Sequence, residues 1–125
     1  VIGSVGRLVE QKDYPTQLEG FARAAAQVPS LRMVLAGEGP LRAELEAMVA
    51  RLGLGDKVRF LGHRTDVPAV LAALDVFVIA SRFEPFGVAV LEAKAAGVAI
   101  VGTQVNELPS ILGHGSCGEL VPPRD

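Results

Sequence analysis

The sequence predicts an α/β fold: a three-layer, Rossmann-like domain with a parallel, doubly wound sheet of about six strands. Short apolar runs rich in β-branched residues alternate along the chain with segments of helical periodicity. Such alternation is typical of right-handed strand–helix–strand units, which build a parallel sheet. The mean hydropathy of +0.37 is also high for a chain of 125 residues. Parallel strands covered on both faces raise this average, and so does apolar surface that serves an absent partner; we expect both.

The first half of the chain predicts three strands and two helices. The strands are short apolar runs at 1–6, 31–36 and 58–61. A polar loop is expected over 7–13. Pro15 suits a first helical position, and Pro29 closes the region of that helix. Pro40 marks the start of a second helix, whose apolar face repeats at helical spacing until Gly53.

The second half predicts three further strands and one longer helix. The strands are expected at 75–80, 98–101 and 119–121. Val88, Leu91 and Ala95 fall at helical spacing, and Gly97 ends that helix as a C-terminal glycine does. Two shorter helical segments are expected at about 66–73 and 107–112.

The strand order places the candidate site. A doubly wound sheet has the order 3-2-1-4-5-6, so strands 1 and 4 lie side by side. Ligands of such folds bind at the carboxyl edge of the sheet, where the strand order reverses. The loops after strands 1 and 4, at 7–12 and 82–87, are therefore expected to meet across a single crevice.

Charge and composition exclude several classes of function. The net charge is −2 with acids and bases interspersed, so no basic stripe indicates a nucleic-acid partner. The single cysteine, Cys117, allows no intrachain disulfide and is interpreted as an ordinary loop thiol. His63 and His114 are interpreted as loop histidines, and no metal is expected, because no His, Asp and Glu residues have ligand spacing. No apolar run reaches the roughly 20 residues that a membrane span needs.

The loop after the first expected strand is a candidate anion site. Arg7 presents a planar fork of donors, and Lys12 a mobile point charge just before a helix. Two cations beside a helix N-terminus suit the phosphates of a nucleotide. On charge pattern alone, the alternative is a solvated loop in which these charges pair with Glu10 and Asp13. The loop is not a P-loop, and residues 3–6 do not match the dinucleotide fingerprint.

The stretch after the fourth expected strand carries two carboxylates. Glu84 lies in the loop, and Glu92 lies about one and a half helical turns beyond Gly87. A carboxylate accepts two hydrogen bonds from vicinal sugar hydroxyls, and Glu84 could also stabilise positive charge that develops at a sugar carbon. The backbone N–H groups of Phe86 and Gly87 are available to sugar oxygens. The alternatives are an exposed turn acid at Glu84 and a solvent-facing Glu92 that supports Lys94 or a neighbour.

Together these motifs resemble the nucleotide-binding C-terminal domain of GT-B glycosyltransferases of the retaining family 4, also called glycosyltransferase group 1. The stretch 5–12 resembles the family's diphosphate loop, and 35–40 resembles its Gly-x-Gly-Pro turn. The stretch 58–62 is similar to the strand that leads to the base pocket, and 81–92 to the paired-glutamate motif. Further matches complete the series at 97–101 and 118–121. The resemblance covers essentially the whole chain.

The resemblance implies the donor-binding part of a retaining glycosyltransferase, which transfers a sugar from a nucleoside-diphosphate sugar to an acceptor hydroxyl. Residues 1–125 would then be a single Rossmann-like donor-nucleotide-binding domain and a fragment of a two-domain enzyme. Without its N-terminal acceptor-binding domain it would be catalytically incomplete. Neither a metal nor another cofactor is expected. The resemblance further implies a cytoplasmic protein, with peripheral association of the full-length protein at the inner membrane face.

The resemblance also implies a role for each site residue. Arg7 and Lys12 would neutralise the diphosphate leaving group, and Glu84 would contact the donor sugar, so these three are the catalytic candidates. Glu92 would hold the ribose hydroxyls, and the loop at 63–64 would border the base through its main chain. The residues expected to bind the donor are Arg7, Lys12, His63, Arg64, Glu84, Phe86, Gly87, Leu91 and Glu92.

Two stretches depart from the family pattern. Asp13 stands where glycine is common in the diphosphate loop, and Asn106 and Glu107 replace a glycine pair that commonly follows Thr103. Side chains in place of that pair could crowd the sugar or phosphate region. Two alternatives stay open: a non-catalytic sugar-nucleotide-binding module, which the altered stretch at 106–107 favours, and a sugar-nucleotide epimerase of the GT-B fold. The base, the sugar and the acceptor also stay open.

Overall fold

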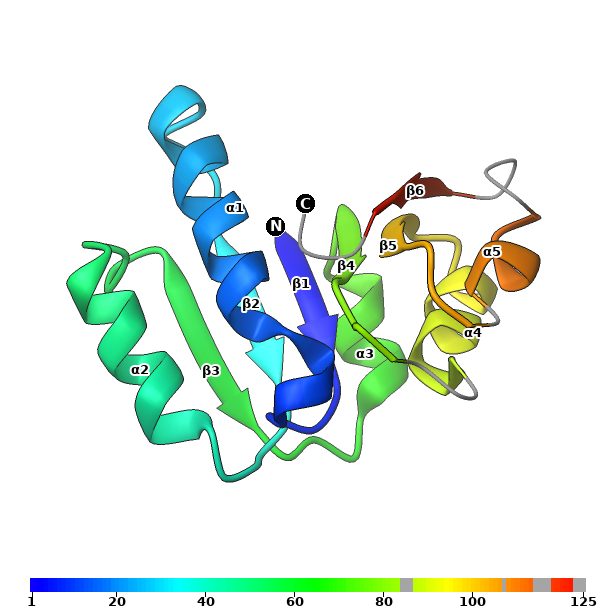
Figure 1. The fold of residues 1–125 in the computed structure, drawn as a ribbon, viewed down its shortest axis with the longest axis horizontal. Coiled ribbons are helices and arrows are strands. Elements are labelled where there is room, and N and C mark those ends of the chain that lie inside the picture. The colour runs from blue at the N-terminus through cyan, green and yellow to red at the C-terminus, as the bar shows by residue number, and fades with distance from the viewer. Residues whose placement is uncertain (84–86, 107, 114–117, 123–125) are drawn as a thin grey trace.

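The sheet of this protein is parallel throughout, as expected. The computed structural model describes residues 1–83, 87–106, 108–113 and 118–122. Within them, six strands pair in the order β3-β2-β1-β4-β5-β6. Figure 1 shows the strands between helices, with the arrowheads of β1, β2 and β3 directed to the same edge of the sheet. The predicted Rossmann-like fold class and strand order are confirmed.

Every expected element is present, with boundaries close to the predicted ones. The strands are β1 (Ile2–Val5), β2 (Met33–Ala36), β3 (Val58–Gly62), β4 (Val76–Ile79), β5 (Ala99–Thr103) and β6 (Glu119–Val121). The helices are α1 (Tyr14–Gln27), α2 (Arg42–Arg51), α3 (Val67–Ala72), α4 (Val88–Ala95) and α5 (Leu108–Ile111). Gly97 follows α4 with a φ of 75°, the left-handed conformation expected of a glycine at that place.

The loop expected at 7–13 contains a turn of 3-10 helix, η1 (Glu10–Lys12). Asp13 follows with φ 49° and ψ 49°, which is left-handed backbone. Its N–H donates to the carbonyl of Glu10 at 3.1 Å, and its own carbonyl accepts from the N–H of Gln17 at 3.4 Å. Asp13 thereby ends η1 and begins α1. A turn this short has no periodicity in the sequence, so the pattern predicted only a loop.

Two apolar cores lie on opposite faces of the sheet, because successive strand residues point to opposite sides. On one face, Met33 and Leu35 of β2 pack with side chains of α1 and α2. On the other face, Phe77 and Ile79 of β4 pack with side chains of α3, α4 and α5, and Val34 of β2 joins them. The helices therefore cover both faces of the strands at the centre of the sheet.

One part of the sheet is less completely covered. Figure 1 shows that α1 and α2 lie over β1, β2 and β3, which form one half of the sheet. The first core, described above, consists of residues from these same elements. On the same face, Val78, Val101 and Val121 of β4, β5 and β6 are half-buried and belong to neither core. Within the ranges that the structure describes, a strip of apolar surface therefore stays accessible there. That such surface serves an absent partner stays a prediction.

Candidate functional site

A crevice of about 460 Å³ opens at the carboxyl ends of β1, β2 and β3. Its lining consists of Val5, Gly6, Arg7, Ala36, Gly37, Glu38, His63, Arg64 and Val67. Arg7, His63 and Arg64 were all predicted as site residues, and they come from two loops that are far apart in the sequence. The crevice lies at the edge where doubly wound sheets bind ligands.

The floor of the crevice is formed by backbone segments in close contact. A Cβ added at Gly37, which has a φ of 147°, would lie 1.8 Å from the carbonyl oxygen of Gly6. Gly6 N–H donates to Ala36 O at 3.0 Å, and Gly37 N–H donates to Gly62 O at 2.8 Å. The loops after β1, β2 and β3 are thus joined by main-chain contacts, and the Gly-x-Gly-Pro turn is what allows that approach.

Arg64 is oriented by a neighbouring carboxylate. Its Nε donates to Asp66 Oδ1 at 2.8 Å, and its Nη2 donates to Asp66 Oδ2 at 2.6 Å. These hydrogen bonds lower the pKa of Asp66 and raise the pKa of Arg64, so both groups stay charged near neutral pH. His63, next to it, is exposed.

The two predicted phosphate-binding cations lie on the β1–α1 loop. Arg7 follows β1 and is exposed, and Lys12 is the half-buried last residue of η1. Among the described residues, Glu10 and Asp13 form ion pairs with Arg82, and Arg7 forms none. In the structure, the acids of this loop therefore do not neutralise Arg7.

The loops after β1 and β4 meet, as predicted from the strand order. Arg82 N–H donates to Gln11 O at 2.9 Å. The Arg82 side chain also reaches Asp13, with 3.4 Å between Nε and Oδ2. Ser81, just before it, is fully buried, and its carbonyl accepts a hydrogen bond from Thr103 Oγ1 of β5 at 2.6 Å. The start of the β4–α4 loop is therefore fixed to the β1–α1 loop and to the end of β5.

The β4–α4 loop leads into the paired-glutamate stretch, of which Glu84 and Phe86 lie outside the described residues. Gly87 is buried, has a φ of 60° and precedes the first residue of α4. The helix that the spacing of Val88, Leu91 and Ala95 predicted is present, and it buries Val90 and Ala93 while those three side chains are exposed. The first turns of α4 are apolar on several sides, so spacing alone could not select the buried face.

Leu91 and Glu92 are consequently exposed on α4. Among the described residues, the Glu92 carboxylate has no hydrogen-bond or ion-pair partner. Lys94 Nζ donates to Ile111 O at 2.9 Å, so Lys94 is not supported by Glu92 as the alternative reading had it. Phe83, Val88 and Leu91 are each about half exposed, which places accessible apolar surface beside the glutamate.

The first residue of the replaced glycine pair keeps a glycine-like backbone. Asn106 is exposed and has a φ of 46°. Asparagine is one of the few residues other than glycine that enter this left-handed region readily. The second residue, Glu107, lies outside the described residues. At Asn106, the backbone conformation that a glycine would supply is therefore retained.

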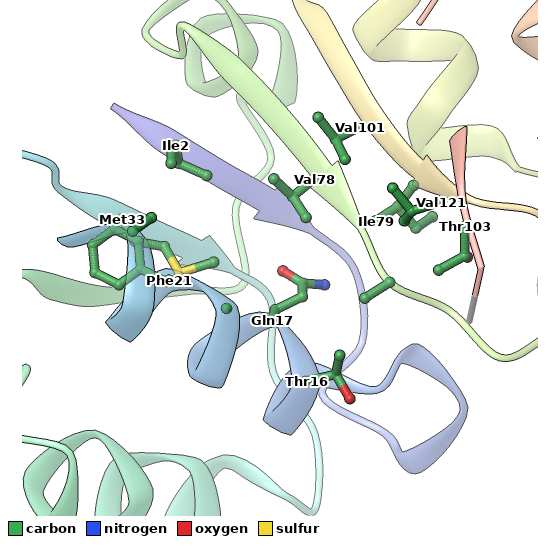
Figure 2. Close-up of a pocket in the computed structure, with 13 residues that line it drawn as sticks. Ile2, Thr16, Gln17, Phe21, Met33, Val78, Ile79, Val101, Thr103 and Val121 are labelled. Carbon is green, nitrogen blue, oxygen red and sulfur yellow. The ribbon is translucent and has the colours of Figure 1, made fainter. Parts of the chain in front are cut away.

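A smaller pocket of about 210 Å³ lies on the face that α1 covers and reaches the carboxyl ends of β4, β5 and β6. Figure 2 shows its lining, which includes Val78, Val101 and Val121 of the accessible apolar strip. Gln17 of α1 reaches toward the strands there, and its Oε1 is buried without a hydrogen-bond partner (Figure 2). Of the predicted site residues that the structure describes, none lines this pocket. The sequence did not indicate its position, because accessible and covered strand valines have the same apolar pattern.

The described residues also bear on metal binding and on membrane insertion. In these ranges, no three His, Cys, Asp or Glu side chains come close enough to hold a metal ion together. None of the helices there combines the length and the apolar character that crossing a bilayer requires.

Comparison with known proteins identifies the family. The model of the family described as glycosyl transferases group 1 matches residues 1–125. The chain belongs to this family. One curated group 1 relative, the lipopolysaccharide core biosynthesis glycosyltransferase LpsE of Rhizobium meliloti, is 39% identical over 104 residues, 83% of this chain and 29% of that protein. The N-acetyl-alpha-D-glucosaminyl L-malate synthase of Bacillus anthracis is 35% identical over 103 residues, 82% of this chain and 27% of that protein.

Solved structures of related glycosyltransferases have the same fold. Anabaena Alr3699/HepE in complex with UDP-glucose matches with a TM-score of 0.89 and 30% identity, over 98% of this chain and 34% of that one. The C-terminal domain of a group 1 family protein, LpcC, from Francisella tularensis matches with a TM-score of 0.87 and 32% identity, over 98% of this chain and 67% of that one. This group 1 chain spans less than a third of the length of the two curated relatives.

Proposed function

We propose that this chain is the donor-binding domain of a retaining glycosyltransferase, which transfers a sugar from a nucleoside-diphosphate sugar to an acceptor hydroxyl. Residues 1–125 would form the single Rossmann-like half of a two-domain enzyme that needs an acceptor-binding domain for catalysis. The observation that carries the proposal is the crevice at the carboxyl edge, lined by Arg7, His63 and Arg64. A similar fold binds UDP-glucose in the related Anabaena protein, which supports the same class of ligand here.

The cations of the β1–α1 loop would act on the diphosphate. When the bond between the sugar carbon and the phosphate oxygen breaks, negative charge develops on that oxygen, and positioned cations stabilise it. Arg7 is exposed at the crevice, and Lys12 directly precedes the residue that begins α1. The N-terminal N–H groups of α1 add positive potential at the same place. Glu84 would face the positive charge that develops at the sugar carbon.

Retention of configuration would follow from attack on the face that the leaving group occupies. The acceptor oxygen forms the new bond to the sugar carbon as the phosphate oxygen departs, and that phosphate oxygen takes the acceptor proton. No protein base is then required. Because Arg7 and Lys12 supply the positive charge, we propose that the transfer needs no divalent metal and no other cofactor.

The nucleoside would lie along the remaining site residues. Glu92 is exposed on α4 and would accept hydrogen bonds from the ribose hydroxyls. Leu91, 48% exposed, would add apolar contact. The 63–64 loop would border the base, and the Gly87 backbone, together with Phe86, would reach sugar oxygens at the start of α4. We further propose a cytoplasmic enzyme whose full-length form associates peripherally with the inner membrane face.

A non-catalytic sugar-nucleotide-binding module is the second candidate. Asn106 in place of a family glycine favours it, because side chains in that stretch could hinder a sugar from reaching its reactive position. Turnover by the full-length protein separates the two candidates. A retaining enzyme forms the glycosylated acceptor together with the nucleoside diphosphate, and the sugar keeps its anomeric configuration in the product, as proton NMR would show.

Calorimetry of the chain with UDP, GDP and ADP tests the donor site. We expect binding of at least one nucleotide, with affinity about tenfold weaker in Arg7→Ala and in Lys12→Ala, since each loses a charge-assisted contact with phosphate. Arg51→Ala is the matched control, because Arg51 is exposed at the far end of α2. Added EDTA should leave the affinities unchanged. Equal affinity in all variants would remove the phosphate assignment.

A further inference from the structure

We propose that Asp13 and Arg82 form a latch that positions the β1–α1 loop, which carries Lys12, against the β4–α4 loop, which leads to Glu84. The two residues are 69 positions apart in the sequence, and their contact joins the two loops. Asp13 and Arg82 are positioning residues, because in this proposal neither side chain touches the donor. The inference rests on the proposed function, because the two loops matter together only if one ligand binds both.

The Asp13 carboxylate is buried and fully engaged. Its side chain is 2% exposed. Arg82 approaches both oxygens, with Nε 3.4 Å from Oδ2 and Nη2 3.5 Å from Oδ1. Thr16 Oγ1 donates to Oδ2 at 2.8 Å. A carboxylate this far from water needs a positive partner and hydrogen bonds, and the planar guanidinium supplies charge toward both oxygens. Asp13 therefore holds the Arg82 side chain in one direction.

Arg82 is fixed to the same loop through its backbone. Its N–H donates to Gln11 O at 2.9 Å, and Nη1 lies 3.9 Å from Glu10 Oε1. Ser81, the preceding residue, is held from the other side by Thr103 of β5. The segment that enters the glutamate stretch is thus connected to the residues directly before and after Lys12. A shift at Asp13 would change the distance between the proposed phosphate cation and the proposed sugar-binding loop.

The backbone of Asp13 indicates that its side chain has a specific role. With φ at 49°, the residue adopts a conformation that costs a non-glycine residue energy and that glycine adopts freely. A carboxylate is nevertheless present and buried there. Asp13→Gly therefore removes the latch while relaxing the backbone, and glycine is also an acceptable residue before a helix. This variant separates the positioning of the loops from the stability of the fold.

A double-mutant cycle tests the latch. UDP and UMP affinities are measured by calorimetry for the wild type, Asp13→Gly, Arg82→Gln and the double variant. We expect each single change to lower the ratio of UDP to UMP affinity by about tenfold, and the double variant to lose no more than either single one. The thermal midpoint of Asp13→Gly should stay within a few degrees of the wild type. Glu46→Gln, which breaks an exposed pair with Arg42 on α2, should change neither quantity.

Additive losses in the double variant, or an unchanged ratio in Asp13→Gly, would overturn the latch. If the wild type binds none of UDP, GDP and ADP, the proposed function fails, and hydrogen exchange then decides on the latch alone. The Arg82 amide should exchange faster in Asp13→Gly while the β2 amides keep their protection. Unchanged exchange at Arg82 would overturn the latch independently of any nucleotide.

Discussion

At the scale of single residues, Arg64 has its orientation set by one carboxylate. Two parallel hydrogen bonds to Asp66 hold the guanidinium beside the crevice, and both partners lie on the exposed β3–α3 loop. Exposed pairs of this kind contribute little to stability, because water and salt screen them. What the pair does is fix the direction of the Arg64 side chain, because the guanidinium cannot rotate freely while both hydrogen bonds persist.

The pKa of Asp66 provides a direct measure of this contact. The hydrogen bonds from Arg64 lower it below the ordinary value of 3.8, so the pair contributes above that value and is lost as the pH falls through the lower pKa of the folded state. Carbon NMR of the Asp66 carboxyl should titrate below 3.8 in the wild type and return toward it in Arg64→Ala. An identical midpoint in both proteins would contradict the contact.

At the scale of the elements, the crevice depends on loops that touch through glycine. The β1–α1 and β2–α2 loops approach so closely at Gly37 and Gly39 that an added Cβ would lie within 2.5 Å of backbone atoms of Gly6 and Leu8. Backbone atoms cannot turn aside as a flexible side chain can. A side chain at either glycine must therefore separate the loops whose contact shapes the crevice.

Gly37→Ala should consequently damage both the fold and the site. Its φ of 147° and the contact with Gly6 O leave no room for a methyl group, and we expect a loss of about 2–3 kcal/mol in the free energy of unfolding. UDP affinity should fall as well, since Gly37 and Gly6 line the crevice. Urea titration measures the first effect and calorimetry the second. Gly55→Ala is the control, because nothing lies within 4 Å of its Cβ position; equal stability of the two variants would refute the packing argument.

The elements that the sequence predicted well are those with a strong apolar period or a clear stop signal. The predicted helix ends lie close to the observed ones at Pro15, Pro40 and Gly97. The sequence indicated less where two patterns competed or none existed. In α4, two apolar stripes of equal spacing were available, and packing on β5 and α5 selected Val90 and Ala93. The turn η1 is too short for any period to indicate it.

At the scale of the whole molecule, the strand order determined most of the candidate site. Once β1 and β4 are neighbours, the loops that follow them must meet, and the sequence predicted this from the alternation of strands and helices alone. The Asp13–Arg82 contact could not be predicted, because a pair 69 positions apart leaves no periodic signal. The accessible strip on the α1 face was likewise missed in detail. The valines of the strip look like covered strand residues in the sequence. They differ only in whether another element packs on them.

The accessible strip makes a prediction about the chain in solution. Val78 and Val101 lie side by side on paired strands, half-buried and outside both cores, so an apolar dye should find surface there. The double change Val78→Thr with Val101→Thr keeps the side-chain shape and suits a strand, but adds hydroxyls. We expect it to reduce anilinonaphthalene sulfonate fluorescence by about half and to lower concentration-dependent association in sedimentation velocity. Val28→Thr is the matched control, because Val28 is an exposed valine away from the strip, and single exposed apolar residues are ordinary. Equal dye binding in the wild type and the double variant would show that the strip is not accessible. The description of this part of the sheet as uncovered would then be wrong.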